Sequence, residues 1–298
     1  MHSLDIMLPF WGEPSYLYET VDAVRAQDCE DWRLTVVDDC YPDPAVAEHF
    51  AALDDPRIVY IRNEQNLGIT ANYRHCLEMA TAELVMLLGC DDVPHPDFVR
   101  RVLHLHRRFP HAQIIQPGVE IIDSSGTVIS PLVDRVKALL RPSASGPRIL
   151  SGEALAASLL RADWLYWPSL VFEREAIAAV PFREGFPIIQ DLALVIDMVA
   201  RGSALLIDPH VCFSYRRHAE SASSTALFDG RRFDGERRYF ALAGSIAEGN
   251  GWRRAARAAR IHSTSRAHAL ALVPKAIGRK DKTAVATLLH HALGRTKD

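Results

Sequence analysis

The chain has 298 residues, 48% of them hydrophobic and 24% charged, which supplies a sizeable core and excludes a globally disordered chain. Its formal net charge of −3 is unevenly distributed, because residues 231–298 hold 15 Lys and Arg against 5 Asp and Glu, whereas residues 1–230 hold 19 and 32. An acidic body followed by a basic tail indicates that the tail docks on the body or meets an anionic partner.

The first 110 residues alternate between short apolar runs and segments of helical periodicity. The apolar runs predict strands at 4–10, 33–39, 57–61 and 83–88, and the periodic segments predict helices at 15–27, 44–53, 69–80 and 97–109. Because the connections are short, this order predicts an α/β fold with parallel strands and helices on both faces of the sheet. The runs are apolar throughout, as expected for strands covered on both sides.

The alternation ends after residue 110. The pattern predicts strands around a Ser-Gly turn at 112–130, a loop at 141–147, helices at 151–160 and 191–202, and two further strands at 204–208 and 211–218. Gly202 is expected to end the second of these helices. From residue 231 the chain is basic and helical. We therefore expect a domain over 1–230, with halves at 1–110 and 111–230, and a helical extension over 231–298.

The five cysteines are an odd number, and none form a C-x-x-C pair. This disfavours a disulfide framework or a structural zinc site and fits a reducing compartment. The stretch MHSLDIMLPF has neither a basic segment nor a long apolar one, so no signal peptide is predicted, and no apolar run approaches the roughly 20 residues of a membrane span. We expect a cytoplasmic protein, with a peripheral place at the inner membrane face as the alternative.

Carboxylates and an aromatic side chain follow three of the predicted strands. Trp11 follows the first strand, the second ends on Asp38 and Asp39, and the fourth runs into Asp91 and Asp92. Because ligands of such sheets bind beyond the carboxyl ends of the strands, these side chains are expected to converge on one cleft. Adjacent carboxylates repel one another unless a positive charge lies nearby, which indicates a cation site. Alternatively, Asp91 and Asp92 only cap the turn that follows them.

The segment LPFWGEPSYLYETVDAVRAQDCEDWRLTVVDDC, followed by NEQNLGITANYRHCLEMATAELVMLLGCDDVPHPDF, resembles the family-two inverting glycosyltransferases of the GT-A fold. The shared features are a strand, a Pro-containing turn and a helix, then a strand ending in Asp-Asp, an Asn-x-Gly before a helix, and a strand ending in an Asp-rich motif. The match covers about residues 4–98, and a weaker one continues to about 224. It implies a nucleotide-binding half at 1–110 and an acceptor-binding half at 111–230.

The resemblance implies a metal-dependent enzyme that moves a sugar from a nucleotide diphosphate to an acceptor hydroxyl with inversion. The acceptor would be a glycan, a lipid-linked molecule or a small molecule. Mg²⁺ or Mn²⁺ would neutralise the leaving diphosphate, with Asp91 and His218 as its implied ligands. The first acid of the family motif is Gly89 here, which puts a direct carboxylate contact to ribose or metal in doubt. Cys90 suits packing against the nucleotide site better than metal binding, because thiolates prefer softer metals.

The resemblance assigns Asp38 to the nucleobase. A carboxylate there can accept the imide proton of uracil or thymine, or the N1 proton of guanine, so UDP- and dTDP-sugars are favoured. Trp11 stands where the family has Tyr and would stack on the base, although it could also be core. Arg217, beside Arg216, could help hold phosphate oxygens. The other residues implied to line the nucleotide sugar are Pro9, Glu13, Asp39, Asn66, Gly68 and Arg216.

Family members carry a Glu-Asp pair at the start of a late helix, and its Asp accepts the acceptor proton. The pair is Gln190–Asp191 here, so Asp191 is the implied general base, and an amide replaces the first acid. Alternatively, Asp191 is only a first-turn acid that the helix dipole favours. Near the acceptor, the aromatic residues Trp164, Tyr166 and Trp167 could face a sugar together with Gln190, or could be core.

Two other functions fit parts of the pattern. A nucleotidyltransferase on a similar sheet would need a Gly-rich basic loop after the first strand, but PFWGEPS has one Gly and no Lys or Arg. A non-catalytic relative that binds nucleotide sugars is favoured by Gly89 and Gln190. The basic extension would cover the acidic body, contact a membrane surface or form a homodimer. No nucleic-acid partner is expected.

Overall fold

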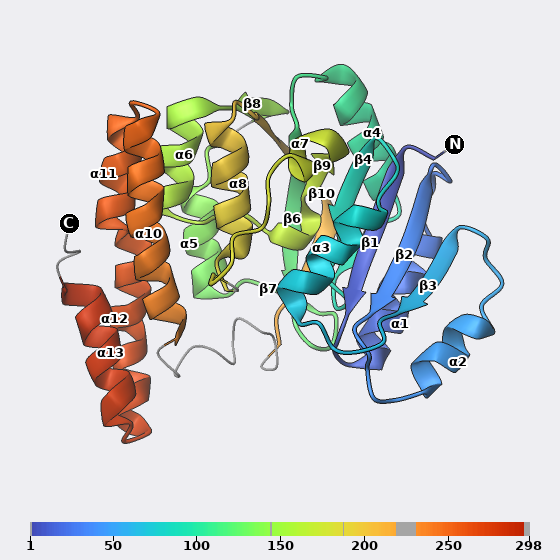
Figure 1. Cartoon of the computed structure of the whole chain (residues 1–298), viewed down its shortest axis with the longest axis horizontal. Coiled ribbons are helices and arrows are strands. Elements are labelled where there is room, and N and C mark those ends of the chain that lie inside the picture. Colours follow the sequence, from blue (N-terminus) through green and yellow to red (C-terminus); the bar gives the residue numbers. More distant parts are fainter. Residues whose placement is uncertain (1, 144, 187, 219–230, 295–298) are drawn as a thin grey trace.

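The computed structural model describes residues 2–143, 145–186, 188–218 and 231–294. One large sheet forms its centre, helices cover both faces of the sheet, and the C-terminal helices lie together at one end of the molecule (Figure 1). This arrangement confirms the predicted α/β class with a mostly parallel central sheet.

Ten strands of the described residues form a single sheet in the order β3-β2-β1-β4-β9-β6-β10-β5, with β7 beside β6 and β8 beside β10. Their bounds are β1 Leu4–Phe10, β2 Trp32–Asp38, β3 Ile58–Arg62, β4 Leu84–Leu87, β5 Val93–Pro94, β6 Ile114–Ile122, β7 Val128–Ile129, β8 Arg148–Leu150, β9 Val171–Glu173 and β10 Leu205–Arg216. Strands β1 to β4 are parallel, as predicted, and β9 joins them to the second half of the sheet by pairing antiparallel to both β4 and β6.

The described helices before residue 219 divide between the two faces. They are α1 Pro14–Arg25, α2 Ala45–Ala51, α3 Ile69–Met79, α4 Phe98–Arg108, α5 Leu132–Leu140, α6 Gly152–Arg161, α7 Arg174–Ala178 and α8 Gln190–Ala200, with a 3-10 turn, η1, at Trp167–Ser169. One apolar cluster packs α1, α2 and α4 against the sheet, and a second packs α3, α6 and α8 against the other face. Burial on both faces explains why the strands read as continuous apolar runs.

The segment predicted as two strands at 204–208 and 211–218 is one strand, β10. The prediction divided it because Pro209 interrupts the apolar run, and proline cannot donate to a sheet ladder. The parallel pairing with β6 instead continues across a bulge, with register shifts at Val211. At this bulge, a Cβ on Gly118 would lie 2.7 Å from the backbone of His210, so only glycine allows the approach. Helix α5 and strand β9 were not predicted.

The C-terminal helices are α10 Arg231–Gly249, α11 Arg253–Ile261, α12 Ser263–Gly278 and α13 Lys282–Leu293. Helices α10 and α11 pack on α6 and α8, and the buried Tyr239 and Phe240 of α10 belong to the same apolar cluster as those helices. Arg254 of α11 also pairs with Glu153 of α6 at 3.2 Å. Part of the basic segment therefore docks on the acidic body. The division of the chain at residue 230 stays a prediction.

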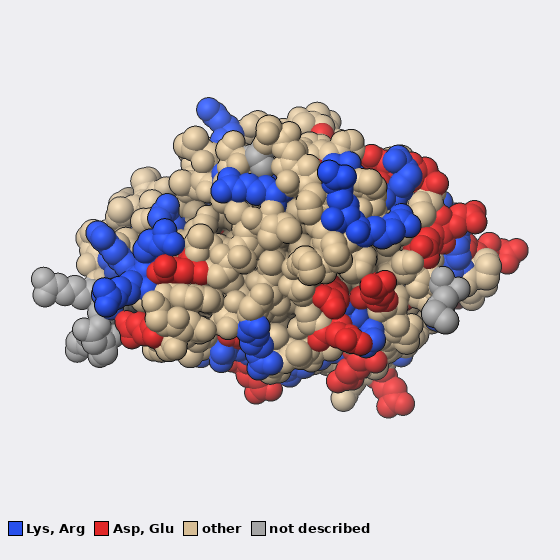
Figure 2. Space-filling model, turned by 90° about the horizontal axis from the view of Figure 1, so that it is seen from above, with Lys and Arg blue, Asp and Glu red and all other residues tan. Residues whose placement is uncertain are grey.

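Charged side chains are distributed unevenly over the surface. On the face shown in Figure 2, most acidic side chains lie in the half away from the C-terminal helices. Among the described residues, no helix combines the length and apolarity that a membrane span requires.

Candidate active site

The carboxyl ends of β1, β2 and β4 lie side by side at the lower edge of the sheet in Figure 1. Phe10 at the end of β1 pairs with Asp38 at the end of β2, and the amide of Leu88, just after β4, donates to the carbonyl of Met7. The residues that follow these strands, Trp11 and Asp91 among them, therefore start from one edge.

Asp91 and His218 meet at this edge. Nε2 of His218, two residues past β10, lies 2.8 Å from Oδ2 of Asp91, and both side chains are partly exposed. A carboxylate oxygen and an imidazole nitrogen form a donor set that suits Mn²⁺ and is compatible with Mg²⁺. The part of the chain that the structure describes contains no group of three or more His, Cys, Asp or Glu side chains arranged for a metal. Among the described residues, Asp91 and His218 are therefore the two side chains placed to hold a cation.

The space beside Gly89 is occupied by Asp92. A Cβ on Gly89 would lie 2.4 Å from Oδ2 of Asp92, closer than any side chain tolerates. Asp92 is almost fully buried, its Oδ1 accepts from the amide of Arg216 at 2.9 Å, and its Oδ2 has no hydrogen-bond partner. Burial, followed by the charge of Asp91, raises the pKa of Asp92 well above its usual range. A side chain at position 89 would therefore compete with Asp92 for this space.

Arg216 is buried rather than available to a phosphate. Its Nε donates to the carbonyl of Asp91 at 2.8 Å, its Nη1 donates to the carbonyl of Asp123, and its Nη2 pairs with Glu19 at 2.7 Å. The guanidinium also lies over the ring of Tyr16. A direct contact of Arg216 with the nucleotide sugar, predicted from the sequence, is not available in this arrangement. Arg216 instead holds the backbone of Asp91 in place.

Arg217 is likewise committed to a protein partner. It forms a bidentate pair with Asp134 of α5 at 2.6 and 2.7 Å, and the hydroxyl of Tyr166 donates to the same carboxylate at 3.1 Å. Bidentate pairing of a guanidinium with a carboxylate is strong and directional, so Arg217 is not free to bind phosphate. The contact fixes α5 beside the residues that precede His218.

Asp38 is completely buried, and its carboxylate already accepts three hydrogen bonds. The donors are the amide of Tyr41 at 2.6 Å, Nη1 of Arg62 at 2.8 Å and the hydroxyl of Tyr60. Burial, followed by the hydrogen bond to Asp38, raises the pKa of Tyr60 to about 12, so this phenol stays protonated. A direct contact between Asp38 and a nucleobase is therefore not open in this structure. Asp38 orients Tyr41 and Arg62 instead.

Asp39 shapes the loop that precedes α3. Its carboxylate accepts from Nδ2 of Asn63 and from the amides of Leu67 and Gly68, at 2.8 to 2.9 Å. Gly68 has a φ of 80°, which glycine adopts without strain, and its amide also lies 3.0 Å from Oδ1 of Asn66. Asp39, Asn66 and Gly68 thus form a turn, and no contact within it needs a ligand.

Trp11 is the exposed aromatic of this edge. It is 53% exposed, and its ring meets the edge of the Tyr41 ring with centroids 5.5 Å apart. The alternative that Trp11 is core is wrong. Glu13 caps α1 by accepting from the amide of Ser15, while Pro9 is half-buried within β1. Cys90 is partly exposed, and burial of its thiol together with the charges of nearby carboxylates raises its pKa, which disfavours a thiolate ligand.

Asp191 lies in the first turn of α8 and is half-buried. Desolvation and then the charge of Asp163 raise the pKa of Asp191 to about 7, while the charge of Lys137 acts in the opposite direction. Its Oδ1 accepts from the amide of Leu192 at 2.8 Å. A carboxylate whose pKa lies near neutrality is suited to take a proton at that pH.

One buried phenol lies between the two groups of carboxylates. The pKa of Tyr215 is raised by burial and then by the charge of Asp92, with smaller contributions from Asp91 and Asp191. The hydroxyl of Tyr215 is therefore within range of the charges that follow β4 and of the charge at the start of α8. Asp91 and Asp191, which are far apart in sequence, both act on the pKa of this one phenol.

Two contacts tie α8 and the loop before it to α3. The hydroxyl of Thr70 in α3 donates to Oε1 of Gln190 at 2.7 Å, and Arg74 of the same helix donates to the carbonyl of Phe182 at 3.0 Å. Gln190 is buried and turned toward α3, so it is committed to this contact.

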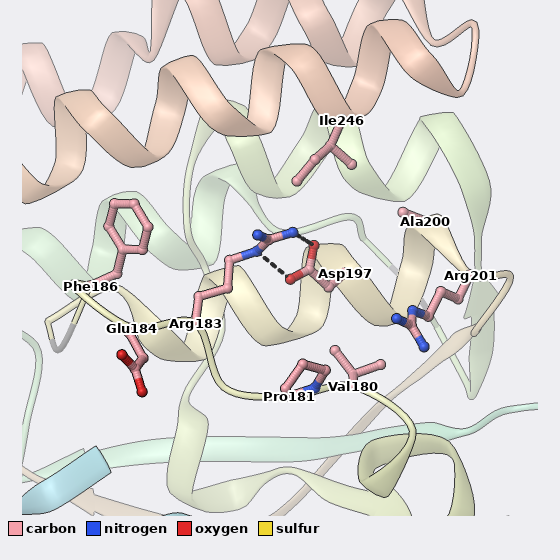
Figure 3. Close-up of a pocket in the computed structure, with 9 residues that line it drawn as sticks. All are labelled: Val180, Pro181, Arg183, Glu184, Phe186, Asp197, Ala200, Arg201 and Ile246. Atoms are coloured by element: carbon pink, nitrogen blue, oxygen red, sulfur yellow. Dashed lines mark hydrogen bonds and ion pairs between the residues drawn. The ribbon is translucent and has the colours of Figure 1, made fainter. Parts of the chain in front are cut away.

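The loop before α8 also borders a cavity of about 420 Å³, drawn in Figure 3. There Arg183 of the loop forms a bidentate pair with Asp197 of α8 at 2.6 and 2.9 Å, and the apolar side chains of Val180, Phe186 and Ile246 lie around the pair. The pair fixes the loop against α8 and so restrains the start of the helix, where Asp191 lies.

The aromatic residues predicted to face an acceptor lie inside the protein. Trp164 is fully buried and donates to Oγ of Ser158, and Trp167 packs against Phe172 and Phe182. Tyr166 is bound to Asp134. Their burial favours the core alternative, because none of the three presents a ring to solvent.

Several residues of the site carry little signal in the sequence. Tyr60 and Arg62 stand two positions apart on β3, which puts them on one face of the strand, and Arg62 pairs in register with Asp38. That spacing could have identified them. Thr70 follows the Asn-x-Gly motif without being part of it, and Lys137 and Asp163 belong to no motif. Only the packing of α3, α5 and the segment before η1 brings these three residues to the site.

Comparison with known proteins agrees with this geometry. Residues 5–143 match the family described as Glycosyl transferase family 2. The Escherichia coli protein WcaA, named for colanic acid biosynthesis, is 30% identical over 90 residues, which are 30% of this chain and 32% of WcaA. An uncharacterized glycosyltransferase of Rickettsia felis is 24% identical over 222 residues, 74% of this chain and 35% of that protein. The chain spans about a third or less of the length of the first curated relatives it matches.

Solved structures show the same fold over nearly the whole chain. Residues 1–349 of S. aureus TarS, crystallised in complex with UDP, superpose with a TM-score of 0.65 at 12% identity, covering 99% of this chain and 82% of that one. The complex of the same protein with UDP-GlcNAc gives a TM-score of 0.63 over 98% and 92% of the two chains. At this identity the likeness establishes the fold alone.

Proposed function

We propose, from the premise that this chain is a family 2 glycosyltransferase with the GT-A fold, that it transfers a sugar from a UDP- or dTDP-sugar to an acceptor hydroxyl with inversion. Two features of the structure support the proposal. The Asp91–His218 pair suits a diphosphate-bound cation, and Asp191, with a pKa of about 7, suits proton removal.

Asp91 and His218 would hold Mg²⁺ or Mn²⁺. When bound, the cation would neutralise the negative charge that develops on the leaving diphosphate. Arg216 supports this pair indirectly, because it fixes the carbonyl of Asp91 and, through its amide, the carboxylate of Asp92. The buried Asp92 lies behind the pair and fills the space that a side chain at position 89 would need.

Trp11 would bind the nucleobase by stacking. It is exposed at the end of β1, and the Tyr41 ring supports it from one side. Tyr41 in turn is held by Asp38, which gives that buried carboxylate an indirect part in base binding. UDP is favoured because relatives of the same fold are described in complex with UDP and UDP-GlcNAc.

Asp191 would act as the general base of a single displacement. It takes the proton of the acceptor hydroxyl while that oxygen bonds to the anomeric carbon, and the bond between this carbon and the diphosphate oxygen breaks. The electron pair leaves with the diphosphate, and attack from the opposite side inverts the configuration. The hydrogen bond from Thr70 to Gln190 would hold the neighbouring Asp191 in place. Because Gln190 is neutral, it adds no negative charge to those of Asp163 and Asp191.

The alternative of a non-catalytic nucleotide-sugar binder keeps one specific observation in its favour, the loss of both acids at Gly89 and Gln190. A panel of nucleotide sugars, screened for hydrolysis with Mn²⁺, Mg²⁺ or EDTA, separates the two. Metal-dependent hydrolysis of one UDP- or dTDP-sugar is expected. Calorimetry with UDP, dTDP, GDP, CDP and ADP gives the base preference. Tight UDP binding without turnover of any sugar would favour the binder, and preference for CDP or ADP would contradict the donor assignment.

A further inference from the structure

Helix α5 has its polarity reversed relative to an ordinary surface helix. Asp134 and Lys137 face the protein, whereas most of its apolar side chains, with Arg135 among them, face solvent. Helices on the surface of globular proteins normally turn an apolar stripe toward the core. The reversal therefore needs an explanation in function rather than in packing.

The inward face of α5 is held by polar contacts. Asp134 pairs with Arg217 at 2.6 Å, and Nζ of Lys137 donates to the carbonyl of Leu165 at 3.0 Å. Just beyond the helix, Arg141 donates to the carbonyl of Asp208 at 3.1 Å. These contacts fix the orientation of the helix, so its outer face cannot turn inward without breaking them.

The outward face is a continuous apolar surface. Leu132 is 74% exposed, Val133 43%, Val136 40% and Leu139 83%. Positions 132, 136 and 139 lie on one stripe of a helix, with 133 at its margin. Together these side chains expose apolar area on the order of a few hundred Å², the size at which such patches mark interaction surfaces.

The surroundings of this face are basic. Residues 131–150 contain four Arg or Lys and one Asp, of which Lys137 and Arg141 are held inward. The one acid, Asp134, is buried and neutralised by Arg217, whereas Arg135 and Arg148 are exposed. An apolar stripe with the exposed Arg135 on the same helix matches the interface of an anionic bilayer, where acyl chains lie beneath negative headgroups.

We propose that the outer face of α5 docks on the surface of an anionic lipid bilayer. Leu132, Val136 and Leu139 insert below the headgroups, and Arg135 pairs with lipid phosphates. The helix spans about 13 Å, so it lies in the interface and does not cross it.

The docking surface lies directly behind the acceptor side of the site. Asp134 holds Arg217 next to His218, and the charge of Lys137 acts on Asp191. A docked α5 therefore brings the proposed general base close to the bilayer surface. In this respect the inference deepens the proposed function, because it favours an acceptor anchored in lipid. The docking itself does not depend on the proposed reaction.

Vesicle sedimentation tests the docking. The full chain is mixed with vesicles of phosphatidylcholine alone or of phosphatidylcholine and phosphatidylglycerol in equal amounts. We expect it to bind the anionic vesicles and to lose about tenfold or more in affinity in the double variant Leu132→Gln/Leu139→Gln. The matched control is Ile277→Gln/Leu293→Gln, which removes side chains 59% and 70% exposed from the C-terminal helices and should bind as the original chain does.

The outcomes are distinguishable. Unchanged vesicle binding by the α5 variant overturns the proposal, and an equal loss in the control assigns binding to the C-terminal helices instead. A second copy of the chain covers the face, and the proposal is wrong, if two results occur together. The original chain is dimeric in gel filtration while the α5 variant is monomeric, and neither of these two proteins binds vesicles. Thermal melting verifies folding, and the single variant Leu139→Gln repeats the test should the double variant be unstable. Donor hydrolysis in solution should be the same in all folded variants, so a failure of docking is separate from a failure of the proposed reaction.

Discussion

Nε2 of His218 lies 2.8 Å from Oδ2 of Asp91, although 127 positions separate the two residues in the sequence. The pair joins the end of β4 to the end of β10, the two strands that belong to opposite halves of the sheet. A ligand that binds both side chains therefore contacts both halves of the sheet.

Nucleotide binding should depend on a divalent cation through Asp91. In Asp91→Ala, the affinity for UDP should no longer change when Mn²⁺ or Mg²⁺ is replaced by EDTA, because the carboxylate that holds the cation is gone. Calorimetry with and without metal measures this. The matched control is Asp97→Ala, since Asp97 forms a similar carboxylate–imidazole pair with His210 at 2.7 Å on the protein surface. A wild-type affinity and activity indifferent to EDTA would refute the metal assignment.

Asp191→Asn should separate binding from transfer. The amide keeps the size of the carboxylate and can still accept from the amide of Leu192, but it cannot take a proton. Sugar transfer should fall by about 10²-fold or more, while UDP affinity stays within a few-fold, because the base acts on the acceptor. If a folded Asp191→Asn protein transfers sugar near the wild-type rate, Asp191 is not the general base and serves only as an acid in the first turn of α8.

The rate of transfer should rise with pH through about 7. The base must be unprotonated, and the pKa of Asp191 is raised to about 7 by burial and by Asp163. Asp163→Asn removes the neighbouring negative charge and should move the midpoint of the pH–rate profile to lower pH. Lys137→Met removes a positive charge and should move it to higher pH. Shifts of the same sign in both variants would contradict this electrostatic account.

The carboxyl group of Asp191 should make the protein more stable as the pH falls, whereas the rate of transfer falls with the pH. Because the pKa of Asp191 is higher in the folded protein than its ordinary value of 3.8, the folded state binds the proton more tightly. Its contribution to the free energy of unfolding is therefore greatest below about pH 4 and is lost as pH rises through about 7. Urea unfolding of the wild type and Asp191→Asn over this pH range measures the difference, which should grow toward low pH in favour of the wild type.

Restoring the family's first acid should harm this protein. A side chain at position 89 would enter the space of Oδ2 of Asp92, so Gly89→Asp should lower the free energy of unfolding by about 1–3 kcal/mol. Asp92→Ala vacates that space, and the double variant should recover part of the stability. Chemical denaturation of the three variants gives the coupling. Strictly additive effects would mean that the two positions do not compete for space.

Trp11 should dominate base binding. Trp11→Ala should weaken UDP affinity by about tenfold or more, since stacking of a base on an aromatic ring contributes about 1–3 kcal/mol. Trp11→Phe should retain most of the affinity. The side chain is 53% exposed, so neither variant should lose much stability. Equal losses in the two variants would point to a role of the indole other than stacking.

Much of the nucleotide-binding half was predictable from local patterns. The apolar runs and helical periods before residue 110 identify the strands and their order in the chain, and the rule that ligands lie beyond carboxyl ends points to the edge that carries Trp11 and Asp91. The resemblance then singled out Asp191 and His218, residues that no local pattern distinguishes. Their roles stay predictions that the experiments above test.

The second half was less predictable because its elements depend on neighbours. Strand β10 continues through Pro209 since β6 supplies a glycine at the bulge, and α5 has no core-facing apolar stripe by which its orientation could be read. Arg216 and Arg217 look like a phosphate-binding pair in the sequence. In the structure both are committed to protein groups, which no spacing rule indicates.

The sequence by itself determined the alternation of strands and helices, the edge at which acidic and aromatic residues gather, and the separation of an acidic body from a basic tail. Those features follow from periodicity and composition, which are local properties. Only the tertiary structure decided which polar groups are already satisfied. Asp38 is closed off by Tyr60 and Arg62, and Asp92 occupies the space beside Gly89. The reason is physical: a buried carboxylate must find its donors wherever packing places them, and that depends on residues far away in the chain.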